Sequence, residues 1–267
     1  MKTTISFLKI SIRRISPPWL IKFRRNYMAA RARRDAAKAL KVYEGLSAQQ
    51  VFTKIYEEGH WGQSPNSDQR FFSGRGSHNA DIVNTYVEAV SAFLSSFVTK
   101  PNIVDLGCGD FTVGSKVRVL CDRYIACDIV ESVISWNKQR YVNDDVDFRV
   151  LDISHDKLPA GDVVFVRQVL QHMSNRQIEG ALSQITDKYK YLILTEHLPA
   201  TGSFAHNLDK PAGPDIRLRL DSGVVLTSPP FNLAIKQEIK LCEFYDSHLA
   251  EGESPKGVIR TTLYQLA

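Results

Sequence analysis

Two glycines follow a short apolar run near the middle of the chain, and they form the first pattern suited to chemistry. The segment reads VDLGCGDF at residues 104–111, and a stretch long enough for a helix comes after it. A strand, a tight turn and a helix start in this order let the backbone approach a nucleotide-like ligand at the helix N-terminus. We therefore expect a ligand-binding loop here.

Acidic residues stand where the next two predicted strands end. Asp128 ends the strand predicted over 124–128, and Asp152 follows the strand predicted over 146–151. Ligands of open parallel sheets bind beyond the carboxyl ends of the strands, so these acids are expected to meet Asp105 in one nucleoside site. Asp128 is placed to accept hydrogen bonds from ribose hydroxyls, and Asp152 to meet an adenine amino group. Alternatively, each acid caps the helix that follows it. For Asp152 this alternative stays open.

Two ligands compete for such a site. A dinucleotide loop prefers Gly-x-Gly-x-x-Gly, whereas the third glycine position holds Thr112 in this chain. Asp110 would repel a pyrophosphate, but acids near the loop would stabilise the sulfonium and ammonium groups of S-adenosylmethionine. The pattern favours S-adenosylmethionine, and an NAD-dependent oxidoreductase is the first alternative.

The elements that must position these residues alternate along the chain. Helical patterns at 112–120, 131–141 and 175–188 separate strand patterns at 102–106, 124–128, 146–151, 162–166 and 191–196. This alternation predicts a mostly parallel sheet with helices on both faces. The segments 236–245 and 258–265 predict an antiparallel hairpin at a sheet edge, and 222–232 reads as a loop.

The basic character of the chain is concentrated at its N-terminus. Residues 1–41 hold twelve Lys or Arg and one acid, whereas the remaining residues hold 22 basic and 28 acidic side chains. The overall charge of +5 therefore does not indicate a nucleic-acid-binding body. We expect 1–46 to form a basic tail or helix that is either solvated, in peripheral contact with an anionic membrane, or a transit peptide or nucleic-acid arm.

The segment 47–99 is expected to form a helical lid. Ser47 is placed to cap a helix over 48–57 that carries Ile55 and Tyr56 on its apolar face. A glycine- and serine-rich loop over 71–78 precedes a second helix at 79–97. Four cysteines without a CxxC pair, and apolar runs too short to span a membrane, favour a cytoplasmic protein with free thiols and no metal site.

The motifs VDLGCGD (104–110), ACD (126–128), LD (151–152) and DVVFVRQVLQHMSN (162–175) together resemble those of class I, seven-stranded, S-adenosylmethionine-dependent methyltransferases. The resemblance covers about residues 100–267 and implies a Rossmann-like sheet of seven strands. Phe111 departs from the pattern, because many members have a third glycine there. The cofactor-binding residues that the resemblance implies are Asp105, Gly107, Cys108, Gly109, Asp128, Ile129, Asp152, Ile153, Arg167 and Gln168.

Four further segments resemble a bacterial group of such enzymes linked to polysaccharide and surface-glycan modification. They are IYEEGHWG (55–62), FSGRGSH (72–78), DIRLRLDSGV (215–224) and SPPFNL (228–233). The resemblance implies a sugar or small-molecule hydroxyl as the methyl acceptor. The tetrapeptide SPPF also matches a motif that nucleic-acid methyltransferases carry directly after the fourth strand. Here it lies about 60 residues farther along the chain, which argues against a nucleic-acid substrate.

Methyl transfer to a hydroxyl requires alignment of the reactants and a base that takes the proton. His172 follows the fourth predicted strand, and an imidazole with an ordinary pKa suits this role. Glu196 is the second catalytic candidate, with a structural role at its strand end as the alternative. The candidates for substrate contact are Arg75, Ser73, Trp61 and His197. Arg75 and Ser73 alternatively close over the carboxylate of the cofactor, and packing of the lid is the favoured role of Trp61. A non-catalytic membrane-associated scaffold is the last alternative.

Overall fold

The computed structural model describes residues 42–64, 67–200, 203–245 and 257–267. The chain divides into two compact units, Met1–Val42 and Tyr43–Ala267, and the second contains the sheet and its helices. This unit includes both the expected lid segment and the expected methyltransferase domain. Residues 1–41 of the predicted basic tail, and its predicted membrane contact, lie outside the described residues. Within the described ranges, no helix is both long enough and apolar enough to cross a membrane.

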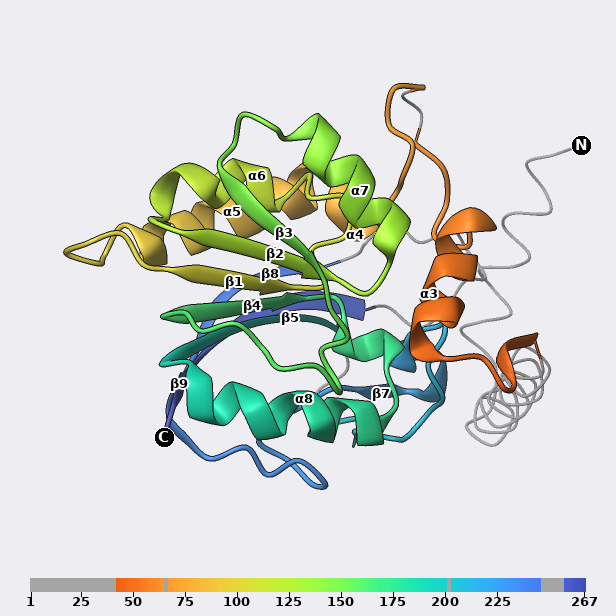
Figure 1. The fold of residues 1–267 in the computed structure, drawn as a ribbon. Coiled ribbons are helices and arrows are strands. Elements are labelled where there is room, and N and C mark those ends of the chain that lie inside the picture. Colours follow the sequence, from red (N-terminus) through yellow and green to blue (C-terminus); the bar gives the residue numbers. More distant parts are fainter. Residues whose placement is uncertain (1–41, 65–66, 201–202, 246–256) are drawn as a thin grey trace, which may run out of the picture. The chain divides into compact units, whose positions relative to one another are not determined.

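A seven-stranded sheet forms the centre of the fold, in the order β3-β2-β1-β4-β5-β9-β8 (Figure 1). The first five strands pair in parallel, whereas β9 lies antiparallel to both of its neighbours. The predicted fold class is confirmed, and the predicted hairpin of β8 and β9 lies at one edge of the sheet, with β8 outermost. The strands are β1 (Ile103–Leu106), β2 (Tyr124–Asp128), β3 (Val146–Val150), β4 (Val163–Arg167), β5 (Tyr191–Pro199), β8 (Ile235–Tyr245) and β9 (Gly257–Leu266).

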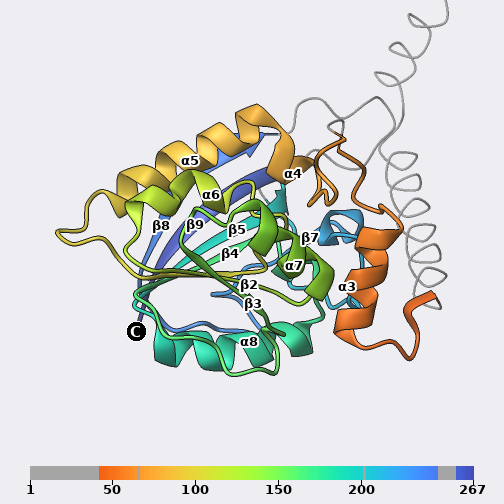
Figure 2. The same ribbon diagram turned by 45° about the horizontal axis from the view of Figure 1, so that its top comes forward.

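Helices cover both faces of the sheet (Figure 2). One face packs on α5 (Ala80–Leu94), α6 (Gly114–Val117) and α7 (Glu131–Arg140), and the other packs on α8 (Asn175–Lys188). Neighbouring residues of a strand point to opposite faces, so Ile103 packs with the α5 side and Val104 with the α8 side. Burial on both faces explains why the central strands are almost continuously apolar.

Local sequence signals fix several boundaries. Ser47 and Ser174 each form a capping box with a glutamine three residues later, at the starts of α3 (Ala48–Glu57) and α8. Both helices have the predicted bounds. The predicted helix at 112–120 is divided into α6 and a 3-10 turn, η1 (Arg118–Leu120). The other short elements are α4 (Arg75–His78), η2 (Leu170–His172), η3 (Arg217–Leu220) and a two-stranded sheet of β6 (Ala205–His206) with β7 (Ser222–Gly223). β7 lies in the segment 222–232, for which we predicted a loop.

Phe111, the departure from the glycine pattern, keeps a backbone conformation that favours glycine. Its φ angle is 60°, and its side chain is fully buried. The ring packs edge-on against Tyr124, Tyr141 and Phe148, with centroid distances of 5.0 to 5.3 Å. A Cβ at Gly114 would lie 2.4 Å from this ring. Aromatic contacts therefore offset the cost of a left-handed phenylalanine.

Replacing Phe111 by alanine should destabilise the protein by about 3–5 kcal/mol, because it leaves a cavity and retains the unfavourable φ. Urea unfolding of the parent and the variant measures this loss. Val142→Ala, at a site that is 72% exposed, is the control and should stay within about 0.5 kcal/mol. A loss in Phe111→Ala no larger than in this control would contradict the packing argument.

Candidate cofactor and acceptor site

A cavity of about 420 Å³ lies at the carboxyl ends of the parallel strands. It includes the point where strand order reverses, between β1 and β4, which is where open parallel sheets bind ligands. Every predicted site residue except Glu196 lines this cavity. These residues are Trp61, Ser73, Arg75, Asp105, Gly107, Cys108, Gly109, Asp128, Ile129, Asp152, Ile153, Arg167, Gln168, His172 and His197.

The two loop glycines are required by their neighbours as well as by their backbone angles. Gly107 has a φ of 80°, and a Cβ there would lie 2.3 Å from Val169 Cγ2. Gly109 has a φ of 55°, and a Cβ there would lie 2.4 Å from Ser73 Oγ. No side chain fits at either position without displacing the facing segment.

Asp128 binds the backbone of the glycine loop through its carboxylate. Its carboxylate accepts hydrogen bonds from the backbone N–H groups of Gly109 and Val130, each at 3.0 Å. Burial raises its pKa to about 6, although these hydrogen bonds lower it. Each carboxylate oxygen has a further lone pair, so Asp128 retains the capacity to accept ligand hydroxyls.

A buried acid and a partly buried guanidinium lie at another part of the same cavity. Burial raises the pKa of Asp105 to about 7, and Tyr124 donates a hydrogen bond to it at 3.0 Å. Arg167 donates to Ser77 Oγ and to the carbonyl of Gly76, and its guanidinium lies 5.0 Å from the Tyr86 ring centroid. An acid and a guanidinium together are suited to a ligand that carries both an ammonium and a carboxylate.

Asp152 caps a turn, and not a helix as its alternative interpretation had it. Its Oδ1 accepts hydrogen bonds from the backbone N–H and the hydroxyl of Ser154, at 2.9 and 2.6 Å. The residue also lines the cavity. Turn capping and cofactor contact are therefore compatible, and the adenine contact stays a prediction.

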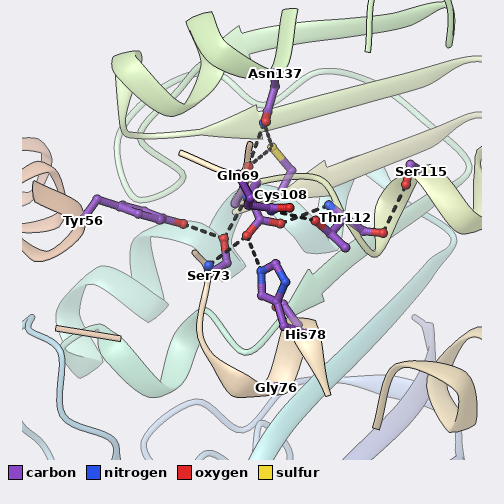
Figure 3. Close-up of polar contacts among 12 residues, drawn as sticks. Tyr56, Gln69, Ser73, Gly76, His78, Cys108, Thr112, Ser115 and Asn137 are labelled. Atoms are coloured by element: carbon purple, nitrogen blue, oxygen red, sulfur yellow. Dashed lines mark hydrogen bonds and ion pairs between the residues drawn. The ribbon is translucent and has the colours of Figure 1, made fainter. Parts of the chain in front are cut away.

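Asp110 does not have the role expected from the sequence, which was to stabilise a cationic ligand near the loop. Its side chain is only 1% exposed and accepts hydrogen bonds from Ser73 N at 2.8 Å, Thr112 N at 3.1 Å and His78 Nε2 at 2.7 Å (Figure 3). Burial alone would raise its pKa, but the hydrogen bonds and the charge of His78 outweigh burial and lower it. The carboxylate binds the segment 71–78 to the cofactor loop, so its charge is compensated within the protein.

His172 lies at the turn η2 with its ring 5.0 Å from that of Trp61. Its Nδ1 is 3.2 Å from the carbonyl oxygen of Gly213, and its Nε2 is 3.3 Å from Gln171 Nε2. Burial, with the nearby charge of Lys210, lowers the pKa of His172 to about 3. The imidazole is therefore neutral at physiological pH, and it is a weaker proton acceptor than an ordinary histidine.

Glu196 lies outside the residues that line the cavity. It is 2% exposed, and neither carboxylate oxygen has a hydrogen-bond partner among the described residues. Burial raises its pKa to about 8, despite the nearby charge of Arg217. A carboxyl that is mostly protonated at pH 7 and remote from the cavity is poorly suited to act as the base, so the geometry favours the structural alternative.

Sequence reasoning assigned no individual role to Arg217, whose side chain is fully buried. Its guanidinium donates to the carbonyl oxygens of Leu208, Leu170 and Met173, at 2.9 to 3.1 Å. The arginine therefore holds the turn that carries His172. The only sequence signal was its place in DIRLRLDSGV, because a single arginine in a loop shows no period and no spacing. Tyr56 and Asp215, which also line the cavity, gave no functional signal either.

Replacing Glu196 by glutamine should stabilise the protein increasingly as pH rises. Between about pH 4.5 and 8 the folded state keeps a proton on Glu196 that the unfolded state releases, so stability falls with pH in this window. We expect Glu196→Gln to raise the thermal midpoint by a few degrees relative to the parent at pH 8, and by less at pH 5. The exposed substitution Glu238→Gln is the control. Equal effects of Glu196→Gln at both pH values would exclude a buried protonated carboxyl.

Comparison with known proteins adds a family assignment for part of the chain. Residues 104–188, less than a third of its length, match a family model described as a methyltransferase domain. No curated protein sequence matches the chain significantly.

Solved structures with the same fold include three methyltransferases. The N-methyltransferase NodS from Bradyrhizobium japonicum, in complex with S-adenosyl-L-homocysteine, has a TM-score of 0.54 at 14% identity, covering 80% of this chain and 98% of its own. Human N-acetylserotonin methyltransferase has a TM-score of 0.52 at 17% identity, covering 92% and 67%. Magnesium protoporphyrin IX methyltransferase from Synechocystis has a TM-score of 0.50 at 14% identity, covering 83% and 99%. At these identities the likeness concerns the fold. The matched segment contains the glycine loop and the acids that follow it, so residues 104–188 are similar to a methyltransferase domain.

Proposed function

We propose that this protein transfers the methyl group of S-adenosylmethionine to a hydroxyl group of a sugar or another small molecule. The observation that carries the proposal is the place of His172 and Trp61. A neutral imidazole and an aromatic ring, with centroids 5.0 Å apart, line the same cavity as the glycine loop. An aromatic face suits the apolar face of a sugar or a small ring, and a neutral imidazole can accept a hydroxyl proton.

The cofactor is proposed to extend along the carboxyl ends of β1, β2 and β4. Asp128 would accept hydrogen bonds from the ribose hydroxyls, and Asp152 would meet the adenine. Arg167 and Asp105 suit the carboxylate and the ammonium of the methionine end, where their charges oppose those of the ligand. Asp105 is buried and Arg167 is partly buried, so these charge interactions are stronger than they would be in water.

The hydrogen bonds of His172 define how it could take part. Gln171 Oε1 accepts from His197 N at 3.2 Å, which leaves the Gln171 amide nitrogen to donate to His172 Nε2. His172 Nδ1 then carries the proton and donates to Gly213 O. The hydroxyl group that accepts the methyl group would replace the Gln171 amide as the hydrogen-bond donor to His172 Nε2. With a pKa of about 3, His172 gives a modest acceleration, and alignment of the hydroxyl with the methyl group contributes more.

The alternatives have less support. A dinucleotide-binding sheet of the usual order is completed by a sixth strand beyond β5, whereas here an antiparallel strand follows β5. None of the described residues 228–231, which form the SPPF motif, lines the cavity. Asn207 holds that motif by donating to the carbonyl oxygens of Ser228 and Pro229. Four expectations from the sequence stay predictions. They are the glycan-associated subgroup, the lid role of 47–99, the cytoplasmic location and the membrane contact of 1–41.

Calorimetry and a transfer assay test the proposed function in two steps. The full chain should bind S-adenosylmethionine and S-adenosylhomocysteine, and NAD should give no heat of binding. With S-adenosylmethionine labelled in its methyl group, label should pass to a sugar or a small phenol in a panel that also includes lipids and RNA. Binding of NAD alone would contradict the cofactor assignment, and label found only in RNA would contradict the acceptor class.

The role of His172 has a pH signature. Because burial keeps its pKa near 3, turnover should not fall as pH decreases from 7 to 5, whereas a base of ordinary pKa would lose half of its activity near pH 6.5. His172→Gln should lower turnover by about 10- to 100-fold, with little change in the affinity for S-adenosylhomocysteine. This loss is at or below the lower end of the rate acceleration that general acid–base catalysis usually supplies. His206→Gln, at an exposed site that does not line the cavity, is the matched control. Unchanged turnover in His172→Gln would remove His172 from the mechanism.

A further inference from the structure

Ser73 connects the cofactor loop to the helical segment that precedes it. Its hydroxyl oxygen accepts a hydrogen bond from the backbone N–H of Asp110 at 2.8 Å, and its own N–H donates to the Asp110 carboxylate at 2.8 Å. The space that Ser73 Oγ fills is open only because residue 109 is a glycine. Ser73 is thus held at the cofactor loop by two hydrogen bonds and by close packing.

Tyr56 continues this connection from the other side of Ser73 (Figure 3). Its hydroxyl lies 2.9 Å from Ser73 Oγ, which fixes the direction of the tyrosine ring. The residue belongs to α3, 17 positions before Ser73, so the contact is not a consequence of local geometry. The Tyr56 ring also packs edge-on against Phe71, with centroids 5.8 Å apart.

The connection ends at the acceptor side of the cavity. The Tyr56 ring packs edge-on against Trp61 with a centroid distance of 5.0 Å. Trp61 lies at the same centroid distance from His172, and its indole N–H donates to the carbonyl of Pro214 at 3.4 Å. A continuous series of contacts therefore runs from the cofactor loop through Ser73 and Tyr56 to Trp61.

We propose that Ser73 and Tyr56 are positioning residues through which the cofactor loop holds the Trp61 ring in place at the acceptor end of the cavity. The proposal rests on the proposed function, because it assigns Trp61 to the acceptor. It gives Ser73 a role distinct from direct substrate contact. It also gives Gly109 a second purpose, which is to admit the Ser73 hydroxyl.

Trp61 itself provides the measurement. The chain has three tryptophans, so Trp19→Phe with Trp136→Phe leaves Trp61 as the only one, and acrylamide quenching then reports its accessibility. In this background, Tyr56→Phe and Ser73→Ala each remove one hydroxyl and should raise the quenching constant at least about twofold. The affinity for S-adenosylhomocysteine, measured by calorimetry, should change by less than about threefold.

Tyr189→Phe is the matched control. It removes another buried tyrosine hydroxyl, which donates to the carbonyl of Pro159 and does not line the cavity. Its quenching constant should equal that of the background protein, even if its thermal midpoint falls as much as that of Tyr56→Phe. Should one of the two test variants fail to fold, the other decides.

The outcomes separate the two proposals. Quenching constants in Tyr56→Phe and Ser73→Ala that equal the background value, with S-adenosylhomocysteine binding intact, would overturn the positioning role alone. A background protein that does not bind S-adenosylhomocysteine would overturn the proposed function, and the quenching result would still decide whether Ser73 and Tyr56 hold Trp61.

Discussion

The buried carboxylate of Asp110 is the interaction on which the site depends. Burial of a charge is costly unless hydrogen bonds compensate it, and Asp110 forms such bonds with Ser73, Thr112 and His78. Because the donors come from the segment before the sheet as well as from the loop after β1, one side chain joins two distant parts of the sequence. The segment 71–78 is therefore fixed to the glycine loop by contacts within the protein.

Burial has opposite effects at the two ends of the cavity. It raises the pKa of Asp105 and Asp128, whose charged forms would be restored by a cofactor that brings hydroxyl donors and an ammonium. It lowers the pKa of His172, so the imidazole at the proposed acceptor end is neutral at physiological pH. A bound cofactor would thus bring charge compensation to the acids, whereas His172 needs none. This division is consistent with a reaction that depends on alignment more than on a strong base.

The sequence predicted well those features that nearby residues determine. The bounds of α3 and α8 follow from capping boxes, and the acids at successive strand ends meet because parallel strands end at one edge. The features that were missed depend on contacts between distant residues. The charge of Asp110 is compensated by His78, 32 positions away, and Arg217 reaches carbonyl groups more than 40 positions away. No periodicity or spacing contains that information. Phe111 is a similar case, since its aromatic partners come from three separate elements of the fold.

The topology of the last two strands has a consequence for how the chain is assembled. β8 precedes β9 in synthesis, yet its only neighbour in the sheet is β9. While β8 emerges from the ribosome, its backbone has no partner strand to pair with, and β5 remains an open edge beside the nearly complete parallel sheet. Both are satisfied only when β9 arrives and pairs with each of them. Until β9 is made, β5 and β8 therefore both carry unpaired edges that are open to unwanted strand pairing.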